Sequence, residues 1–176
     1  MNNTQAKTKK LILSALMAAL ICVATMVIQV PTYTGGYIHL GDGFVLLSGI
    51  LLGPILGALS AGIGSMLADV LTGHVQWAPA TFIIKALAAL LVGLIYKKIS
   101  KKLSLNTYVS VILSGIASGL VVVFGYFAYN TLILGNVFAA AAASIPTDTL
   151  QSVVGIVISC TLLPLLKKIP GIKELG

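Results

Sequence analysis

Charged residues are scarce in this sequence, and acidic residues are the scarcest of them. Only 9% of the 176 residues are charged, with four acids against eleven basic residues, whereas an average soluble domain has about 25%. Hydrophobic residues make up 58% of the chain, and the mean hydropathy is +1.06. This balance excludes an ordinary soluble domain. It predicts a polytopic membrane protein built as one domain over residues 1–176.

Sequence motifs for catalysis are also absent. There is no GxxxxGK(S/T) loop, so the chain is not expected to bind and hydrolyse ATP by that route. No GxSxG, HExxH or paired-carboxylate motif argues for an enzyme. Cys22 and Cys160 each fall within an apolar run and imply no disulfide or metal framework. Both histidines lie near an aspartate in sequence, but not at the spacing of a known metal site, so we expect no metal and no cofactor.

Ten of the eleven basic residues are lysines in three clusters beside apolar runs, at residues 7–10, 97–102 and 167–173. The net charge of +7 therefore does not point to nucleic acid. Lysines beside membrane spans accumulate on the cytoplasmic side and orient the chain. The clusters predict which helix ends face the cytoplasm.

Apolar runs of about 20 residues are long enough to span a bilayer. The chain has such runs at Leu11–Val30, Ala78–Tyr96, Tyr108–Leu134 and Ile145–Leu166. The first run follows lysines, as a signal peptide does, but it lacks a convincing small-x-small cleavage site, so we expect a retained helix. Loops are predicted between these runs, with a polar and aromatic one at 32–40 and another at 135–144.

The remaining apolar stretch, Asp42–Leu71, is either one long helix or two helices separated at Gly53-Pro54. Two helices, Gly43–Leu52 and Ile55–Leu71, place all three lysine clusters on one side of the membrane. One helix would set the first cluster opposite the other two, against the positive-inside rule. We therefore expect an all-α integral membrane protein with six transmembrane helices and cytoplasmic N and C termini.

Small residues recur every fourth position in the second half of that stretch and lead to a carboxylate. The row is Gly53, Gly57, Ala61, Ser65 and Asp69. This spacing places them on one helix face, where small side chains let another helix approach closely. An acid in apolar surroundings marks a functional site by default. The alternative is that Asp69 lies at a helix end in water, before a turn.

Lys85 is the only lysine outside the three clusters. It lies seven residues past Ala78, about 10 Å along a helix. A buried ammonium needs a partner, and the expected partners are Asp69 and Asp148. Lys85 could form a structural ion pair or contact a ligand, and the sequence leaves both readings open.

Aromatic and hydrogen-bonding residues share faces of three helices near the same depth. Tyr126, Tyr129 and Asn130 stand at i, i+3 and i+4, and comparable faces begin at Trp77 and at Asp148. Such faces suit a small, flat, polar ring, although Trp and Tyr also gather in interfacial belts. The predicted substrate-binding residues are Tyr37, His39, Asp69, Trp77, Lys85, Tyr126, Tyr129, Asn130, Asp148 and Gln151.

With these residues in view, the chain resembles an S component, the substrate-binding membrane subunit of an energy-coupling factor (ECF) vitamin transporter. The resemblance covers nearly the whole chain. It rests on LGDGFVLLSGILLGPILGALSAGIGSMLADVLTG, on WAPATFIIKALAALLVGLIYKK and on IPTDTLQSVVG. Each segment is a weak signal alone, but the Gly-Pro turn, Gly-rich helix and Trp-Pro helix start are fairly specific together.

The resemblance implies a vitamin bound at the outer face, under the loop after the first helix. It also implies two kinds of partner, a transmembrane coupling subunit and two ATPase subunits, in the plasma membrane of a bacterium. Ala15 and Ala19 resemble the small-residue face that such subunits present to their membrane partner. A lysine, two acids and tyrosines favour pyridoxine or hydroxymethylpyrimidine. The alternative function is a solitary secondary transporter that uses the buried charges as a proton or ion relay.

Overall fold

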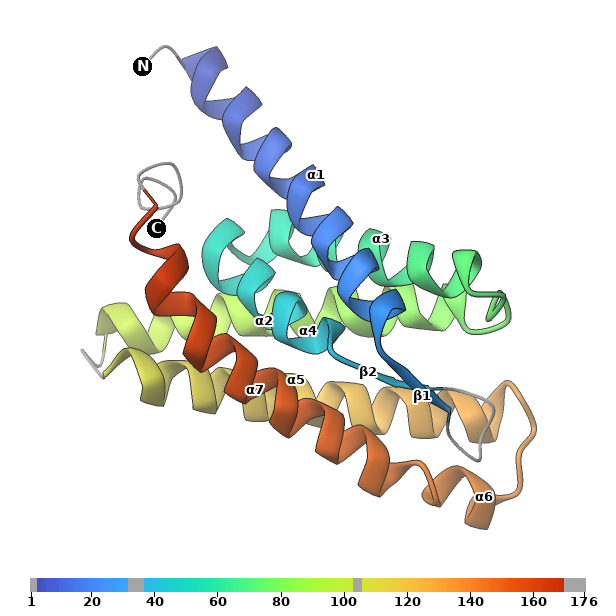
Figure 1. The fold of residues 1–176 in the computed structure, drawn as a ribbon. Coiled ribbons are helices and arrows are strands. Elements are labelled where there is room, and N and C mark those ends of the chain that lie inside the picture. Colours follow the sequence, from blue (N-terminus) through green and yellow to red (C-terminus); the bar gives the residue numbers. More distant parts are fainter. Residues whose placement is uncertain (1–2, 32–36, 103–105, 170–176) are drawn as a thin grey trace.

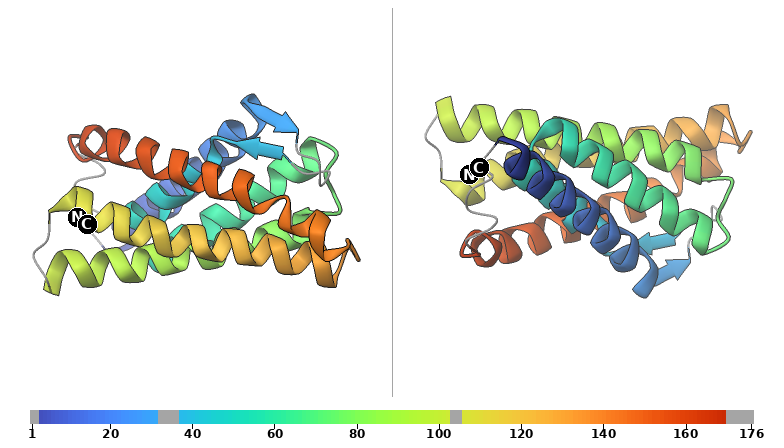
Figure 2. Two further views of the ribbon diagram at one scale, coloured as in Figure 1. Left: turned by 90° about the horizontal axis from the view of Figure 1, so that it is seen from below. Right: turned by 90° about the horizontal axis from the view of Figure 1, so that it is seen from above.

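The computed structural model describes residues 3–31, 37–102 and 106–169, and most of them are helical. The helices are α1 (Asn3–Val27), α2 (Gly41–Leu52), α3 (Pro54–Leu71), α4 (Ala78–Lys102), α5 (Thr107–Leu132), α6 (Phe138–Ala142) and α7 (Ile145–Leu166). In the bundle α3 packs on α4, α4 on α5 and α5 on α7, while α1 crosses over α2 and α3 (Figures 1 and 2). Within the described residues, five helical stretches are long and apolar enough to cross a membrane, and α2 is a shorter apolar helix. The predicted class of all-α membrane protein is confirmed.

The segment after α1 differs from the prediction of a helix to Val30 and then a loop. The helix ends at Val27, and Gln29–Pro31 forms a strand, β1, that pairs antiparallel with β2 (Tyr37–His39). The physical reason is Pro31. It has no N–H to donate to a helix, and it disfavours the helical conformation for Val30. Residues 32–36 of the expected loop lie outside the described residues.

Other predicted boundaries also shift, because several helices are longer than a bilayer requires. α1 begins at Asn3 rather than Leu11, and α4 continues through the lysine cluster to Lys102. Lysine is a good helix former, so a lysine cluster at a membrane boundary does not itself end a helix. The expected loop at 135–144 contains the five-residue helix α6.

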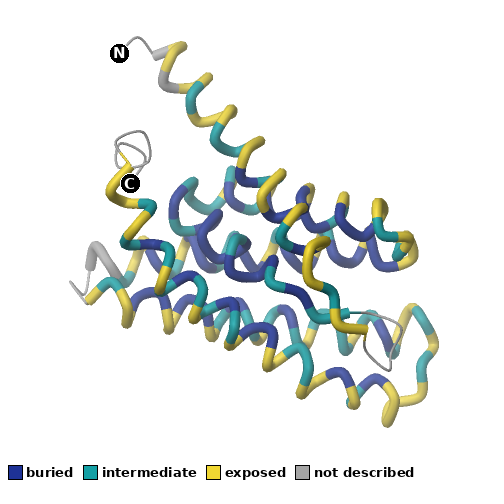
Figure 3. The backbone as a smooth tube through the Cα atoms, in the orientation of Figure 1, coloured by how far each residue is buried: buried dark blue, intermediate teal, exposed yellow. Residues whose placement is uncertain are grey.

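The split of the Gly41–Leu71 region into two helices is confirmed. Gly53 separates them with φ of 81°, a conformation that glycine adopts without strain, and Pro54 is the first residue of α3. The 12 residues of α2 span about 18 Å, short of the roughly 30 Å of a hydrocarbon core. This length is tolerated because α1, α3, α4 and α7 surround α2, and none of its residues is exposed (Figure 3).

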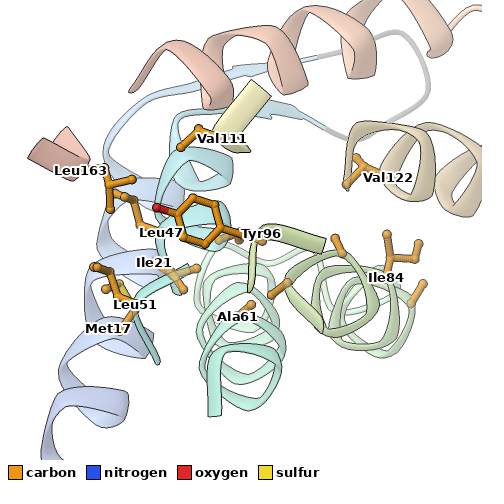
Figure 4. Packing of buried hydrophobic residues seen from close by; sticks show 14 residues of the cluster. Met17, Ile21, Leu47, Leu51, Ala61, Ile84, Tyr96, Val111, Val122 and Leu163 are labelled. Carbon is orange, nitrogen blue, oxygen red and sulfur yellow. The ribbon is translucent and has the colours of Figure 1, made fainter. Parts of the chain in front are cut away.

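Close backbone packing brings α2 and α4 together. A Cβ atom at Gly93 would lie 2.9 Å from the carbonyl oxygen of Gly49 and 2.7 Å from the nitrogen of Pro54, so only glycine fits without a shift. Apolar side chains from α1, α2, α4 and α7 complete this core, among them Ile21, Leu47 and Leu163 (Figure 4). The consequence is that the first turn of α2 lies against the middle of α4.

The two ends of the bundle differ in charge. The start of α1 and the ends of α4 and α7, which carry the lysine clusters, lie together at one end (Figures 1 and 2). The strand pair and α6 lie at the opposite end. The described acids are Asp42, Asp69 and Asp148, at the first turn of α2, the last turn of α3 and the first turn of α7. The acids therefore gather toward the end that the lysine clusters avoid.

Candidate functional site

A pocket with a cavity volume of about 50 Å³ lies at the end of the bundle where the described acids gather, the acidic end. It is bounded by β2, the end of α3, the start of α4, the end of α5 and the start of α7. The lining residues are Tyr37, His39, Asp69, Trp77, Thr81, Tyr126, Asn130, Ser144, Asp148 and Gln151. Segments far apart in the sequence thus converge on one small cavity, which we call the pocket.

Eight of the ten predicted substrate-binding residues line the pocket, and Lys85 and Tyr129 do not. The structure adds Thr81 and Ser144. Thr81 lies four residues after Trp77 on the same helix face, so the four-residue spacing along that face could have indicated it. Ser144 follows α6 in a region expected to be a loop, and no sequence signal marked it.

The expectation that Lys85 pairs with Asp69 or Asp148 is wrong. Lys85 is fully buried, and its Nζ lies 2.5 Å from Oδ1 of Asp42, which is 3% exposed. The cause is the close packing of α2 on α4, which brings the first turn of α2 to the depth of Lys85. The side-chain amide of Gln151 donates to the other oxygen, Oδ2 of Asp42, at 3.0 Å.

His39 completes this arrangement. Its backbone N–H donates to Oε1 of Gln151 at 3.0 Å, and its Nδ1 accepts from the N–H of Gly41 at 3.1 Å. Burial, with the nearby Lys85 charge, lowers the pKa of His39 to about 4, against an opposing effect of Asp42. His39 is therefore neutral at pH 7. We call Asp42, Lys85, Gln151 and His39 the ion-pair cluster.

Asp69 is held by only one of its two oxygens. Tyr37 donates from its hydroxyl to Oδ1 at 2.6 Å, which ties the strand pair to α3. Burial and this bond to a carboxylate raise the pKa of Tyr37, so its hydroxyl keeps its proton. Oδ2 of Asp69 is buried and makes no hydrogen bond of ordinary length among the described residues, and the same holds for Oδ2 of Asp148, although the hydroxyls of Thr81 and Ser144 lie near these two acids.

Aromatic rings form one wall of the pocket. The ring of Trp77 meets Tyr126 edge-on at 6.0 Å between centroids and packs on Tyr129 at 5.5 Å. Tyr126 shares a hydrogen bond of 3.1 Å with Thr81. Tyr129 instead points its hydroxyl to the carbonyl of Gln76, so it supports Trp77 from outside the pocket.

The amide of Asn130 is already engaged. Its Nδ2 donates to the carbonyl of Tyr126 at 3.0 Å, and its Oδ1 accepts from Nδ2 of Asn136 at 2.9 Å. Asn130 therefore stabilises the end of α5, and its amide has little hydrogen-bonding capacity left for a ligand. The open hydrogen-bonding capacity of the pocket lies elsewhere, on the two aspartates.

The chemistry of the pocket is that of binding. Aromatic faces beside fixed polar groups can stack on a small ring and read its edge. Within the described residues, no group of three or more His, Cys, Asp or Glu side chains is arranged to hold a metal ion.

Comparison with known proteins gives a family and a relative. A family model described as "ECF-type riboflavin transporter, S component" matches residues 5–168, a range that includes every residue lining the pocket. A protein of Pyrococcus woesei, named as an uncharacterized protein in a gap 3' region, is 33% identical over 149 residues. That alignment covers 84% of this chain and 95% of the Pyrococcus protein.

Proposed function

Because the chain belongs to the family of ECF-type transporter S components, we propose that it captures a water-soluble vitamin or vitamin precursor in the pocket. It then delivers this cargo inward with a transmembrane coupling subunit and two ATPase subunits. An S component binds substrate and is not itself an enzyme. ATP hydrolysis is assigned to the partners, in keeping with the missing phosphate-binding loop.

The pocket is the observation that carries this proposal. It lies at the end opposite the lysine clusters, which the positive-inside rule assigns to the outside. An outward-facing pocket with aromatic and polar walls is what a vitamin-capturing subunit needs.

We propose a single-ring, hydroxylated heteroaromatic as the cargo, either pyridoxine or hydroxymethylpyrimidine. Trp77 and Tyr126 supply faces for one ring, and the carboxylates of Asp69 and Asp148 can accept from hydroxyl groups. Riboflavin is the second candidate. The observation that favours riboflavin is the family's own description, and it remains a required probe in every binding assay.

Orientation in the membrane can be tested with single cysteines at positions 5, 53 and 100. We propose that the two termini and the Gly53-Pro54 turn face the cytoplasm, because the three lysine clusters lie at that end. An impermeant thiol reagent should leave all three positions unlabelled in intact cells and label them after permeabilisation. Labelling in intact cells would overturn the orientation.

Docking to the coupling subunit is assigned to the α1 face with Ala15 and Ala19, which are both exposed. Small residues let a partner helix approach closely, and bulky ones obstruct it. The double substitution Ala15→Trp with Ala19→Trp should abolish uptake while vitamin binding persists. Leu120→Trp, at a position of α5 that is 54% exposed, is the matched control and should preserve uptake.

Vitamin uptake in two hosts tests the function itself. A host that supplies the coupling subunit and ATPases should accumulate the vitamin when this chain is expressed, and a host without them should not. A solitary secondary transporter would accumulate substrate in both hosts. That result would replace the S-component mechanism with the proton- or ion-relay alternative.

A further inference from the structure

The charges at the pocket do not balance. Asp69 and Asp148 line it, but no lysine does, because Lys85 is paired with Asp42 beneath. His39 also lines the pocket and is neutral at pH 7, since its pKa is lowered to about 4 by burial and by Lys85. A ligand in the pocket therefore meets two carboxylates and no free cation among the described lining residues.

The carboxylates also have unused acceptor capacity. Asp69 is 4% exposed, it lines the pocket, and its Oδ2 has no partner in the described part of the chain. Oδ2 of Asp148 is likewise buried and unpartnered. Buried polar atoms normally have partners, and an unpaired buried carboxylate is costly. Both acids line the pocket, so donors from a bound ligand or from water are the compensation open to them.

We propose that the pocket selects a single-ring heteroaromatic that presents amino N–H donors or a positive charge to Asp69 and Asp148, and that it rejects carboxylate-bearing relatives. The ligand is thus an amino-substituted pyrimidine or pyridine. This inference rests on the proposed function, and it narrows the cargo from a single-ring heteroaromatic in general to one that carries an amine.

Rejection follows from the same geometry as selection. A ligand carboxylate would be placed beside two protein carboxylates, with Lys85 already engaged, and like charges at short range oppose binding. Specificity of this kind is built by repulsion of the wrong ligand as much as by attraction of the right one. Each charge-assisted hydrogen bond to the correct ligand is worth about ten- to a hundredfold in affinity.

Two matched ligand series test the proposal by calorimetry on the purified full-length chain at pH 7.5. The first is pyridoxamine, pyridoxine and 4-pyridoxic acid, which vary one substituent from amine to hydroxyl to carboxylate on the same ring. The second is 4-amino-5-hydroxymethyl-2-methylpyrimidine and its analogue without the amino group. In the ring that binds, the amine should bind about tenfold or more tightly than its neutral analogue. The carboxylate should bind weakest.

Variants assign that preference to the two acids. Asp69→Asn removes the negative charge but keeps a side-chain oxygen that can accept from the Tyr37 hydroxyl. Asp148→Asn removes the negative charge in the first turn of α7 and likewise keeps a side-chain oxygen. Either substitution should reduce the preference for the amine by about tenfold. The control is Tyr96→Phe, which removes a hydroxyl that accepts a hydrogen bond from Nζ of Lys167 toward the lysine-rich end. This variant should leave the preference unchanged.

The outcomes separate this inference from the proposed function. A carboxylate that binds within threefold of its amine, or a preference that survives both Asn variants, overturns the inference alone. Riboflavin binding with neither series binding also overturns it, while vitamin capture stands. Failure of every probe, riboflavin included, overturns both.

Discussion

Two groups of buried polar side chains adjoin at the acidic end and share His39 and Gln151, and they differ in how fully their carboxylates are bonded. In the ion-pair cluster, both oxygens of Asp42 have partners, Lys85 at 2.5 Å and Gln151 at 3.0 Å. In the pocket, Asp69 and Asp148 each leave an oxygen unpartnered within the described residues. Carboxylates of the same kind thus have both oxygens hydrogen-bonded in the ion-pair cluster and one oxygen unpartnered in the pocket.

This difference teaches which groups serve the fold and which serve a ligand. A buried carboxylate with both oxygens hydrogen-bonded holds helices together and needs no donor from a bound molecule. A buried acceptor without a partner destabilises the free protein and can be compensated only by a ligand or water. The lysine that stood out most in the sequence belongs to the first group, although it lies directly below the second.

Breaking the ion-pair cluster should have the largest effect. Lys85→Met leaves Asp42 buried without its cation, and losing one partner of a buried pair costs about 3–5 kcal/mol of stability. The measurement is unfolding in detergent, with vitamin affinity determined on the same sample. We expect the melting temperature to fall more than the affinity does.

Removal of both charges is the control for this prediction. Asp42→Leu with Lys85→Met should recover most of the lost stability, because an apolar pair of similar volume often replaces a buried ion pair at little cost. Unchanged stability in Lys85→Met, with affinity lost, would instead make Lys85 a ligand-binding residue.

Lowering the pH should weaken the ion-pair cluster by a somewhat smaller amount. His39 has a pKa of about 4 in the folded protein and about 6.5 when unfolded. Above pH 6.5 both states are neutral there. As pH falls from 6.5 to 4 the unfolded chain binds a proton that the folded chain does not, so stability declines, by at most about 3 kcal/mol.

The variant His39→Gln isolates this contribution. Measured by thermal unfolding, the variant should lose less stability than the parent chain between pH 7 and pH 4. The acids titrate in both proteins, so the difference between them reports His39. Parallel curves for the two proteins would show that His39 does not titrate as its buried position requires.

A matched pair of tyrosine variants sharpens the comparison at the pocket. Tyr37→Phe removes the donor to Oδ1 of Asp69 and should cost about 1.5–3 kcal/mol, as for a hydrogen bond to a charged group. Chemical or thermal unfolding measures this loss. A cost below that of an ordinary neutral bond would mean that Asp69 is not charged in the free protein.

Tyr129→Phe makes the same chemical change outside the pocket and should have the smallest effect. The lost bond goes to the backbone carbonyl of Gln76, which is worth about 1 kcal/mol or less. The ring that packs on Trp77 remains, so vitamin affinity should stay within threefold of the parent. A larger loss of affinity would show that Tyr129 takes part in ligand binding.

Much of this arrangement was predictable, because the signals are periodic or depend on depth. The lysine clusters predicted which helix ends lie together, and Gly53-Pro54 predicted the break between α2 and α3. The lengths of the apolar runs predicted that the long helices exist, although not their ends. Residues such as Asp69, Asn130 and Asp148 were expected at one depth, and they line one pocket.

The features that escaped prediction depend on contacts between helices. The Lys85–Asp42 pair exists because Gly49 and Gly93 let α2 and α4 touch, which no spacing within one helix reveals. Tyr129 and Asn130 are adjacent on α5, so a small rotation places one in the pocket and the other outside it. The strand pair escaped because β1 is only three residues long and follows an apolar helix without interruption.

Native mass spectrometry of the purified chain, incubated with an equimolar mixture of vitamins, tests whether the open carboxylates of the pocket select the cargo. We predict one bound single-ring amine per chain in the parent protein and in the Tyr96→Phe control, with occupancy sharply reduced in Asp69→Asn. Carboxylate-bearing vitamins in the mixture should stay unbound. A chain that emerges free of any vitamin, or that carries the same vitamin whether or not Asp69 is charged, would contradict this prediction.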